Sequence, residues 1–179
     1  IYLKKTFSKV YKYLMKILAL QSRMGIGDTI IFLPYIKAIS EKFNSPVSIL
    51  VKENSKADQY LFGASYIDEI IILDRTKKTQ SRHSGLFGGL NLIKDLKKYN
   101  FNKIFIFNSS LRYHLIAKLS NIKEIYQYPL FEKKYQHITN TPKKFINDNL
   151  GINVNDDPKI ELNENLIQNA IKNFKIDKN

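Results

Sequence analysis

The residues best suited to chemistry lie in a short glycine-rich stretch near the start of the chain, Gly25-Ile26-Gly27-Asp28. Asp28 is the first acidic residue of the sequence, and the two glycines before it can adopt backbone angles that other residues resist. A carboxylate in such a turn can accept a proton from a substrate hydroxyl. The same residues also fit a simpler role, in which the glycines make a tight turn and Asp28 caps a helix.

The flanks of this stretch predict the order strand, turn, helix. An apolar run, Ile17-Leu18-Ala19-Leu20, precedes it, and an amphipathic segment from Ile30 to Phe43 follows it. A helix that begins near Asp28 would direct its positive end towards whatever binds above the strand. Two phosphate-binding motifs are excluded, because Ile30 replaces the third glycine of the dinucleotide fingerprint and no Gly-Lys-Ser/Thr follows.

Strand and helix patterns alternate along the rest of the chain. Further strands are expected at 47–51, 67–73, 103–107 and 123–128, and helices at 55–62, 90–99, 111–119, 141–150 and 163–174. This alternation predicts an α/β fold with a doubly wound, Rossmann-like parallel sheet.

Residues 74–90 are predicted to form a long polar loop after the third strand. Open parallel sheets bind ligands at the carboxyl ends of their strands, so cations in this loop can hold phosphates or carboxylates. A solvated loop without a ligand is the alternative interpretation. The candidate cations are Arg75, Lys77, Lys78 and Arg82.

Two further candidates lie later in the sequence. Arg112 is in the first turn of a helix that follows Asn108-Ser109-Ser110, where it can reach an anionic ligand or remain an exposed surface side chain. His137, in a loop rich in lysine and tyrosine, can hydrogen-bond a substrate or serve the structure. The three histidines of the chain do not have metal-ligand spacing, so no metal site is expected.

Composition limits the class of protein. The 179 residues carry a net charge of +13, which predicts attraction to polyanions, and the chain contains no cysteine. Disulfides and thiolate metal sites are therefore excluded. No stretch approaches the roughly 20 apolar residues of a membrane span. We expect one domain over residues 15–179, preceded by an extension over residues 1–14.

The extension has the pattern of a basic amphipathic helix. Lysines 4, 5, 9 and 12 alternate with an apolar face made of Leu3, Phe7, Val10, Tyr11 and Leu14. Such a helix can lie on an anionic membrane. The pattern also fits a helix that packs on the domain, or a poorly ordered extension.

From Met15 onwards the sequence resembles the glycosyltransferase family 9 heptosyltransferases. The resemblance begins with Met15–Ile39, which contains the Gly-Asp step, an apolar stretch and a proline. It continues through Ile67–Leu73, through Phe101–Arg112 and through Lys134–Ile138. Where the family has an acid and a Gln-Gly pair, this chain instead has Phe107, Ser109 and Ser110.

This resemblance implies the N-terminal half of a GT-B glycosyltransferase. Such enzymes transfer heptose from a nucleotide-sugar to the inner core of lipopolysaccharide, with inversion and without a metal. It also implies that Asp28 is the general base and that Gly25 and Gly27 let the acceptor approach. The basic loop, Arg112 and His137 would then face the phosphorylated acceptor. The implied enzyme is bacterial and cytoplasmic, and works on the cell envelope at the inner membrane.

The resemblance further implies that the nucleotide-sugar, with ADP-heptose as the expected donor, binds a C-terminal domain that this chain lacks. The chain is therefore interpreted as a fragment that folds but does not catalyse transfer alone, and no cofactor is expected. The main alternative is a non-catalytic basic module that binds an anionic glycan or nucleic acid. Nucleic acid is not the expected partner, because no RNA-recognition aromatic motif is present. A nucleotide-binding enzyme is a further alternative, although Asp28 would repel a phosphate in its glycine turn.

Overall fold

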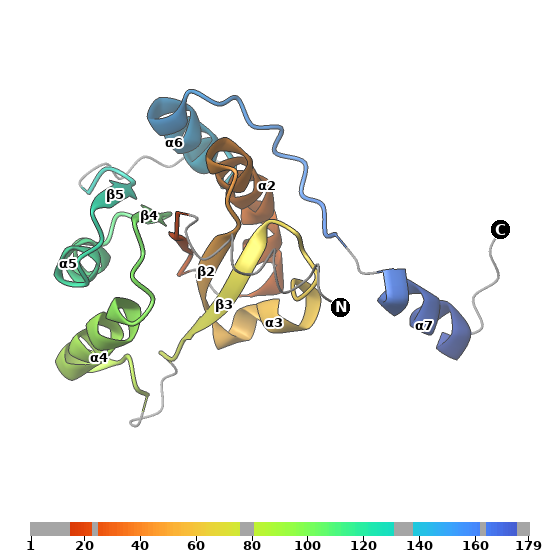
Figure 1. Cartoon of the computed structure of the whole chain (residues 1–179), viewed down its shortest axis with the longest axis horizontal. Helices are drawn as coiled ribbons and strands as arrows, with labels where there is room; N and C mark the ends of the chain where they lie inside the picture. The colour runs from red at the N-terminus through yellow and green to blue at the C-terminus, as the bar shows by residue number, and fades with distance from the viewer. Residues whose placement is uncertain (1–14, 23–24, 76–80, 131–137, 162–163, 175–179) are drawn as a thin grey trace, which may run out of the picture.

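The computed structural model describes residues 15–22, 25–75, 81–130, 138–161 and 164–174. Five parallel strands form one sheet in the order β3-β2-β1-β4-β5, which places the first strand in the middle (Figure 1). This is the arrangement of a Rossmann-like fold. All five strands lie where the sequence predicts them: β1 (Ile17–Leu20), β2 (Val47–Lys52), β3 (Ile67–Leu73), β4 (Lys103–Ile106) and β5 (Glu124–Gln127).

The central strand is apolar because it is covered on both faces. Every residue of β1 is buried, and Ile17 is in register with Val47 of β2 and with Lys103 of β4. A strand that is buried on both faces of a parallel sheet has a continuous run of apolar residues in its sequence. The outer strand β5 is more exposed, and its Glu124 forms an ion pair with Lys103.

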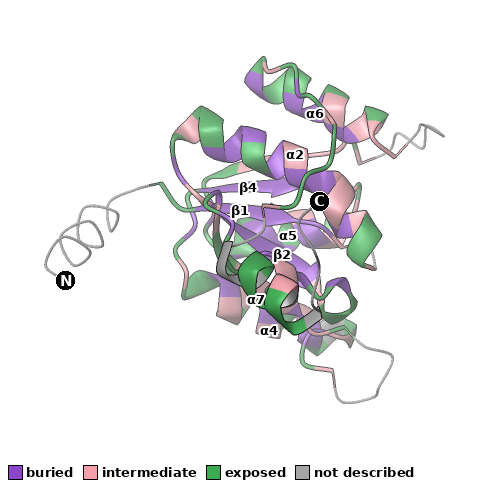
Figure 2. Cartoon of the chain, turned by 90° about the vertical axis from the view of Figure 1, so that its right-hand side faces the viewer, coloured by how far each residue is buried: buried purple, intermediate pink, exposed green. Residues whose placement is uncertain are grey.

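Helices cover both faces of the sheet, as Figures 1 and 2 show. Helices α2 (Ile26–Phe43) and α6 (Asn140–Leu150) lie together on one face. Helices α4 (Gly85–Lys97) and α5 (Leu111–Leu119) lie together on the other. The other helical segments in the described residues are η2 (Glu53–Ser55), α3 (Ala57–Tyr60) and α7 (Glu164–Phe174).

The two faces of the sheet have different cores. Aromatic rings fill the side under α2 and α6, where Phe105 stacks on Tyr126 at 4.6 Å and Phe107 meets Phe145 edge-on at 5.5 Å between ring centroids. The side under α4 and α5 is mostly aliphatic; among its members are Leu18, Leu20, Leu92, Leu96, Ile104, Ile106 and Ile116.

Three helix boundaries differ from the prediction. Helix α2 begins at Ile26, before Asp28, and the helix expected over 55–62 consists of η2 and α3. Helix α4 begins at Gly85, so the polar loop is shorter than expected. The glycines that suggested a loop belong to this helix. Glycine is required at position 88, because a Cβ there would lie 2.2 Å from the carbonyl carbon of His83.

The amphipathic helix expected over residues 1–14 lies outside the described residues and stays a prediction. Among the residues that are described, no helix combines the length and apolarity needed to cross a membrane.

Candidate functional site

The turn after β1 depends on the backbone of Gly25. This residue occupies the N-cap position of α2 with a φ of 108°, a conformation that L side chains rarely adopt. Its carbonyl accepts hydrogen bonds from the backbone N–H of Thr29 at 3.4 Å and from Thr29 Oγ1 at 3.1 Å. Asp28 therefore does not cap the helix, and it lies in its first turn.

Asp28 presents a carboxylate at this turn. The buried Gln21, directly after β1, donates from Nε2 to the backbone oxygen of Asp28 at 3.4 Å. In the described part of the chain, no hydrogen bond or ion pair involves the Asp28 carboxylate. Gly27 beside it is exposed, and a Cβ there would meet no atom within 4 Å. Asp28 is itself half-buried, next to the exposed Gly27 and in the first turn of α2, at the positive end of the helix.

A polar network fixes the neighbouring turn after β4. Asn108 donates from Nδ2 to Ser22 Oγ at 3.1 Å, which joins this turn to the turn after β1. Its Oδ1 accepts the backbone N–H of Ser110 at 3.0 Å. Gln127, at the end of β5, donates to the carbonyls of Asn108 and Ser110, both at 3.0 Å, and pairs with His114 Nδ1 at 3.0 Å. The sequence predicted the turn but not this network of hydrogen bonds. The only feature of the sequence that points to it is the polar triplet Asn108-Ser109-Ser110.

Helix α5 brings two of the predicted cations together. Arg75, just after β3, donates from Nη1 to the hydroxyl of Tyr113 at 3.2 Å and is itself exposed. Arg112 is half-buried and donates from Nη2 to the carbonyls of His83 at 3.1 Å and Gly85 at 3.0 Å. Both guanidinium groups thus lie beside the carboxyl edge of the sheet, Arg75 open to solvent and Arg112 holding the start of α4.

Arg82 has a different environment. Its guanidinium forms a bidentate pair with Asp95 of α4, at 2.7 Å from Nε and 2.8 Å from Nη2. The buried His83 accepts the backbone N–H of Asp74 at Nδ1, at 3.1 Å, which assigns the proton to Nε2, 3.2 Å from Asp95. Hydrogen bonds from Arg82, His83 and Lys98 hold the pKa of Asp95 well below its usual range. This cluster fastens the polar loop to α4.

The other predicted residues, Lys77, Lys78 and His137, lie outside the described residues. Of the candidate set, the structure therefore gathers Gly25, Gly27, Asp28, Arg75 and Arg112 around one edge of the sheet, and it directs Arg82 towards α4. Over the described ranges, no group of three or more acidic or histidine side chains could hold a metal ion.

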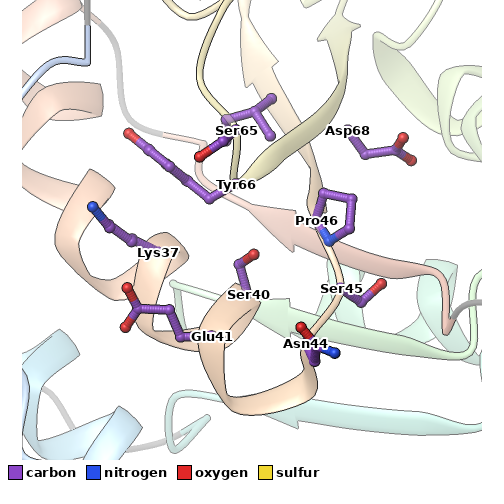
Figure 3. Close-up of a pocket in the computed structure, with 10 residues that line it drawn as sticks. Lys37, Ser40, Glu41, Asn44, Ser45, Pro46, Ser65, Tyr66 and Asp68 are labelled. Atoms are coloured by element: carbon purple, nitrogen blue, oxygen red, sulfur yellow. The ribbon is translucent and has the colours of Figure 1, made fainter. Parts of the chain in front are cut away.

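A separate cavity of about 460 Å³ opens at the opposite edge of the sheet (Figure 3). Lys37 and Glu41 of α2 line it together with Tyr66 and Asp68, close to the first residues of β2 and β3. Burial and the neighbouring Glu161 raise the pKa of Tyr66 to about 12, so this hydroxyl stays neutral at ordinary pH. None of the predicted site residues that the structure describes lines this cavity.

Comparisons with known proteins find similar folds among solved structures and no match elsewhere. No protein-family model and no curated protein matches the chain. A glycosyl transferase family 9 protein from Veillonella parvula superposes with a TM-score of 0.64 at 14% identity, over 92% of this chain and 51% of its own. For E. coli ADP-heptose lps heptosyltransferase II the TM-score is 0.57 at 12% identity, and the match covers 92% of this chain and 52% of that protein. For E. coli heptosyltransferase WaaC with ADP the TM-score is 0.55 at 14% identity, and the match covers 89% of this chain and 54% of that protein.

Over most of its length the chain shares the fold of about half of the solved family 9 glycosyl transferase. The resemblance stated from the sequence is thus confirmed at the level of the fold. The chain spans about half the length of each structure that it matches.

Proposed function

We propose that this chain is the acceptor-binding part of an inverting glycosyltransferase. The enzyme transfers heptose or a related sugar from a nucleotide-sugar to the inner core of lipopolysaccharide. The observation that carries the proposal is the position of Asp28, which is half-buried next to the exposed Gly27 at the carboxyl edge of the sheet, in a fold shared with a family 9 glycosyl transferase. Ligands of open parallel sheets bind at this edge.

The chemistry assigned to Asp28 is general-base catalysis. Its carboxylate takes the proton from the acceptor hydroxyl as that oxygen attacks the anomeric carbon of the donor. The bond from the anomeric carbon to the nucleoside diphosphate breaks with its electron pair, and the sugar configuration inverts. The donor itself binds in a second domain of the enzyme, and this part of the proposal rests on the half-length match to the solved structures.

The anionic groups of the acceptor are assigned to the basic side of the site. Arg75 is the main candidate among the described residues, because its guanidinium is exposed and Tyr113 orients it. Arg112, which its hydrogen bonds to α4 hold in place, adds positive charge to the same side. Lys77, Lys78 and His137 are also assigned to acceptor binding, as predictions from the sequence.

The test is Asp28→Asn in the enzyme that contains both this chain and its donor-binding domain. Loss of a general base lowers kcat by roughly 10²- to 10⁴-fold, and the KM for the acceptor should change by only a few-fold. Asp58→Asn, on the exposed surface of α3, is the matched control and should leave kcat unchanged. An Asp28→Asn enzyme with full kcat contradicts the proposal. So does sugar transfer by the isolated chain.

The alternative is a basic module that binds an anionic glycan or nucleic acid without chemistry, and the net charge of +13 favours it. In that case Asp28→Asn would leave binding intact. Affinity for random nucleic acid would fall steeply with salt. Measuring both separates the two functions.

A further inference from the structure

Helices α4 and α5 expose large apolar side chains to solvent. Phe87 is 81% exposed, and Leu90 in the same helix is about half exposed. In α5 the leucines at 111, 115 and 119 are also about half exposed. Exposed apolar residues grouped over two adjacent helices indicate a surface that meets something other than water.

These side chains point away from the sheet. Helix α4 packs on the sheet through Leu92 and Leu96, and α5 packs through Tyr113, Ile116 and Ala117. Residues four apart share one side of a helix, so the three leucines of α5 form a line on the side opposite its buried residues. Phe87 and Leu90 occupy the corresponding side of α4. Because the two helices lie side by side on the same face of the sheet (Figure 1), their outer sides form one surface, which we call the α4–α5 face.

The charge of the α4–α5 face is positive. Lys94 and Lys97 of α4 and Lys118 of α5 are exposed among the apolar side chains. Asp95 is the one acidic residue of the two helices, and it is paired with Arg82, His83 and Lys98. The face therefore presents apolar groups and lysines with no exposed carboxylate to repel an anion.

We propose that the α4–α5 face lies on the surface of an anionic lipid bilayer. Structures that lie in a membrane interface combine apolar side chains such as leucine and phenylalanine with lysines that attract anionic lipids. Each lysine near an anionic leaflet adds to the attraction, while the apolar side chains enter the boundary between headgroups and acyl chains. A protein partner fits less well, because the centres of protein interfaces are depleted in lysine.

The position of the face suits a site that works on a lipid-linked molecule. Phe87 and Leu111 lie in the first turns of α4 and α5, at the same edge of the sheet as Arg75 and Asp28. Contact with a bilayer would bring this edge close to an acceptor anchored there. This link to the acceptor rests on the proposed function, whereas the membrane contact itself does not.

The test is flotation of the full chain with lipid vesicles. We expect it to bind vesicles that contain phosphatidylglycerol and not vesicles of phosphatidylcholine alone. Leu115→Gln combined with Leu119→Gln should lower the partition coefficient at least tenfold, as should Lys94→Gln, Lys97→Gln and Lys118→Gln combined. The matched control replaces three exposed lysines that lie outside the α4–α5 face, and it should change the partition coefficient less than twofold. Its substitutions are Lys42→Gln, Lys159→Gln and Lys172→Gln. Circular dichroism verifies that each variant is folded.

Several outcomes would overturn the proposal: an absence of vesicle binding, equal binding by the face variants and the parent chain, or equal losses in the face and control variants. Loss of binding only when lysines 4, 5, 9 and 12 are replaced by glutamine would assign the contact to the extension. A dimer in sedimentation that Leu115→Gln dissociates would assign the face to a second copy of the chain. Asp28→Asn should not affect flotation, so a failure of this proposal is distinguishable from a failure of the proposed function.

Discussion

Gly25 and Gly27 are two residues apart, and their local conformations differ. Gly25 has a φ of 108°, and a Cβ on it would lie 3.6 Å from Oδ2 of Asp28. Gly27 lies inside α2 with open space where a side chain would point. The first glycine is thus required by the backbone of the turn, whereas a side chain could replace the second without a clash.

Gly25→Ala should therefore lower the free energy of unfolding by about 1–2 kcal/mol, because alanine resists a positive φ. Gly27→Ala is the matched control and should keep that free energy or raise it by up to about 1 kcal/mol, since alanine favours a helix. Urea unfolding of both variants gives the comparison. Equal stability of the two variants would show that the turn does not depend on Gly25.

At the scale of single residues, the sequence predicts the conformation of those residues that depend only on their neighbours in the chain. The turn of Gly25 and the position of Asp28 near a helix start follow from neighbours in the chain. The environments of Arg82 and Arg112 do not, because their partners Asp95, His83 and Gly85 are 13 to 29 residues away in sequence. Tertiary packing determines which basic side chains are engaged in the structure and which remain open to a ligand.

At the scale of elements, one carboxylate joins a loop to a helix. Asp95 of α4 receives Arg82 and His83 from the loop and Lys98 from the helix end. These donors lower its pKa from the ordinary value of 3.8. A carboxyl group whose pKa is lower in the folded state stabilises the fold above its ordinary pKa, and it loses that effect as the pH falls towards the lowered value.

We expect Asp95→Asn to lower the free energy of unfolding by about 1–2 kcal/mol at pH 7, after allowance for the exposure of Arg82. The difference from the parent chain should stay constant down to about pH 5 and shrink below pH 4. Denaturant titrations over this pH range measure it. Asp148→Asn, which breaks an exposed pair with Lys144, should cost only a few tenths of a kcal/mol. A difference independent of pH would exclude the ion pairs as its cause.

Elements with a strong hydrophobic pattern are predicted well from this sequence. The strands and the long helices follow directly from apolar runs and periodicity. The start of α4 was not predictable, because three glycines in five residues favour a loop unless something specific requires them. Here the requirement is the close approach of Gly88 to the backbone of His83, a contact that periodicity cannot reveal.

For the whole molecule, Phe105 of β4 is one of the residues that join the aromatic core across several elements. It is fully buried and meets rings from three other elements, those of Phe43, Tyr126 and Phe145. Its removal would leave a cavity among groups that belong to α2, β5 and α6.

Phe105→Ala should therefore cost about 3–5 kcal/mol of unfolding free energy, a large fraction of the stability of a typical domain. Phe62→Ala, at a ring that is 58% exposed, should cost no more than about 0.5 kcal/mol. Thermal and denaturant unfolding measure both. A small loss at Phe105 would mean that the surrounding helices close over the gap.

The central position of β1 has a consequence for the order of events during translation. Its neighbour β2 follows within about thirty residues, but its other neighbour, β4, ends at Ile106. At roughly 5–20 residues per second, a ribosome needs about 4–17 s to proceed from Leu20 to Ile106. Throughout that interval one side of an apolar strand lacks its backbone partners in the nascent chain. A ribosome-associated chaperone can bind this unpaired edge of β1. The edge becomes unavailable only when β4 has emerged and paired with β1.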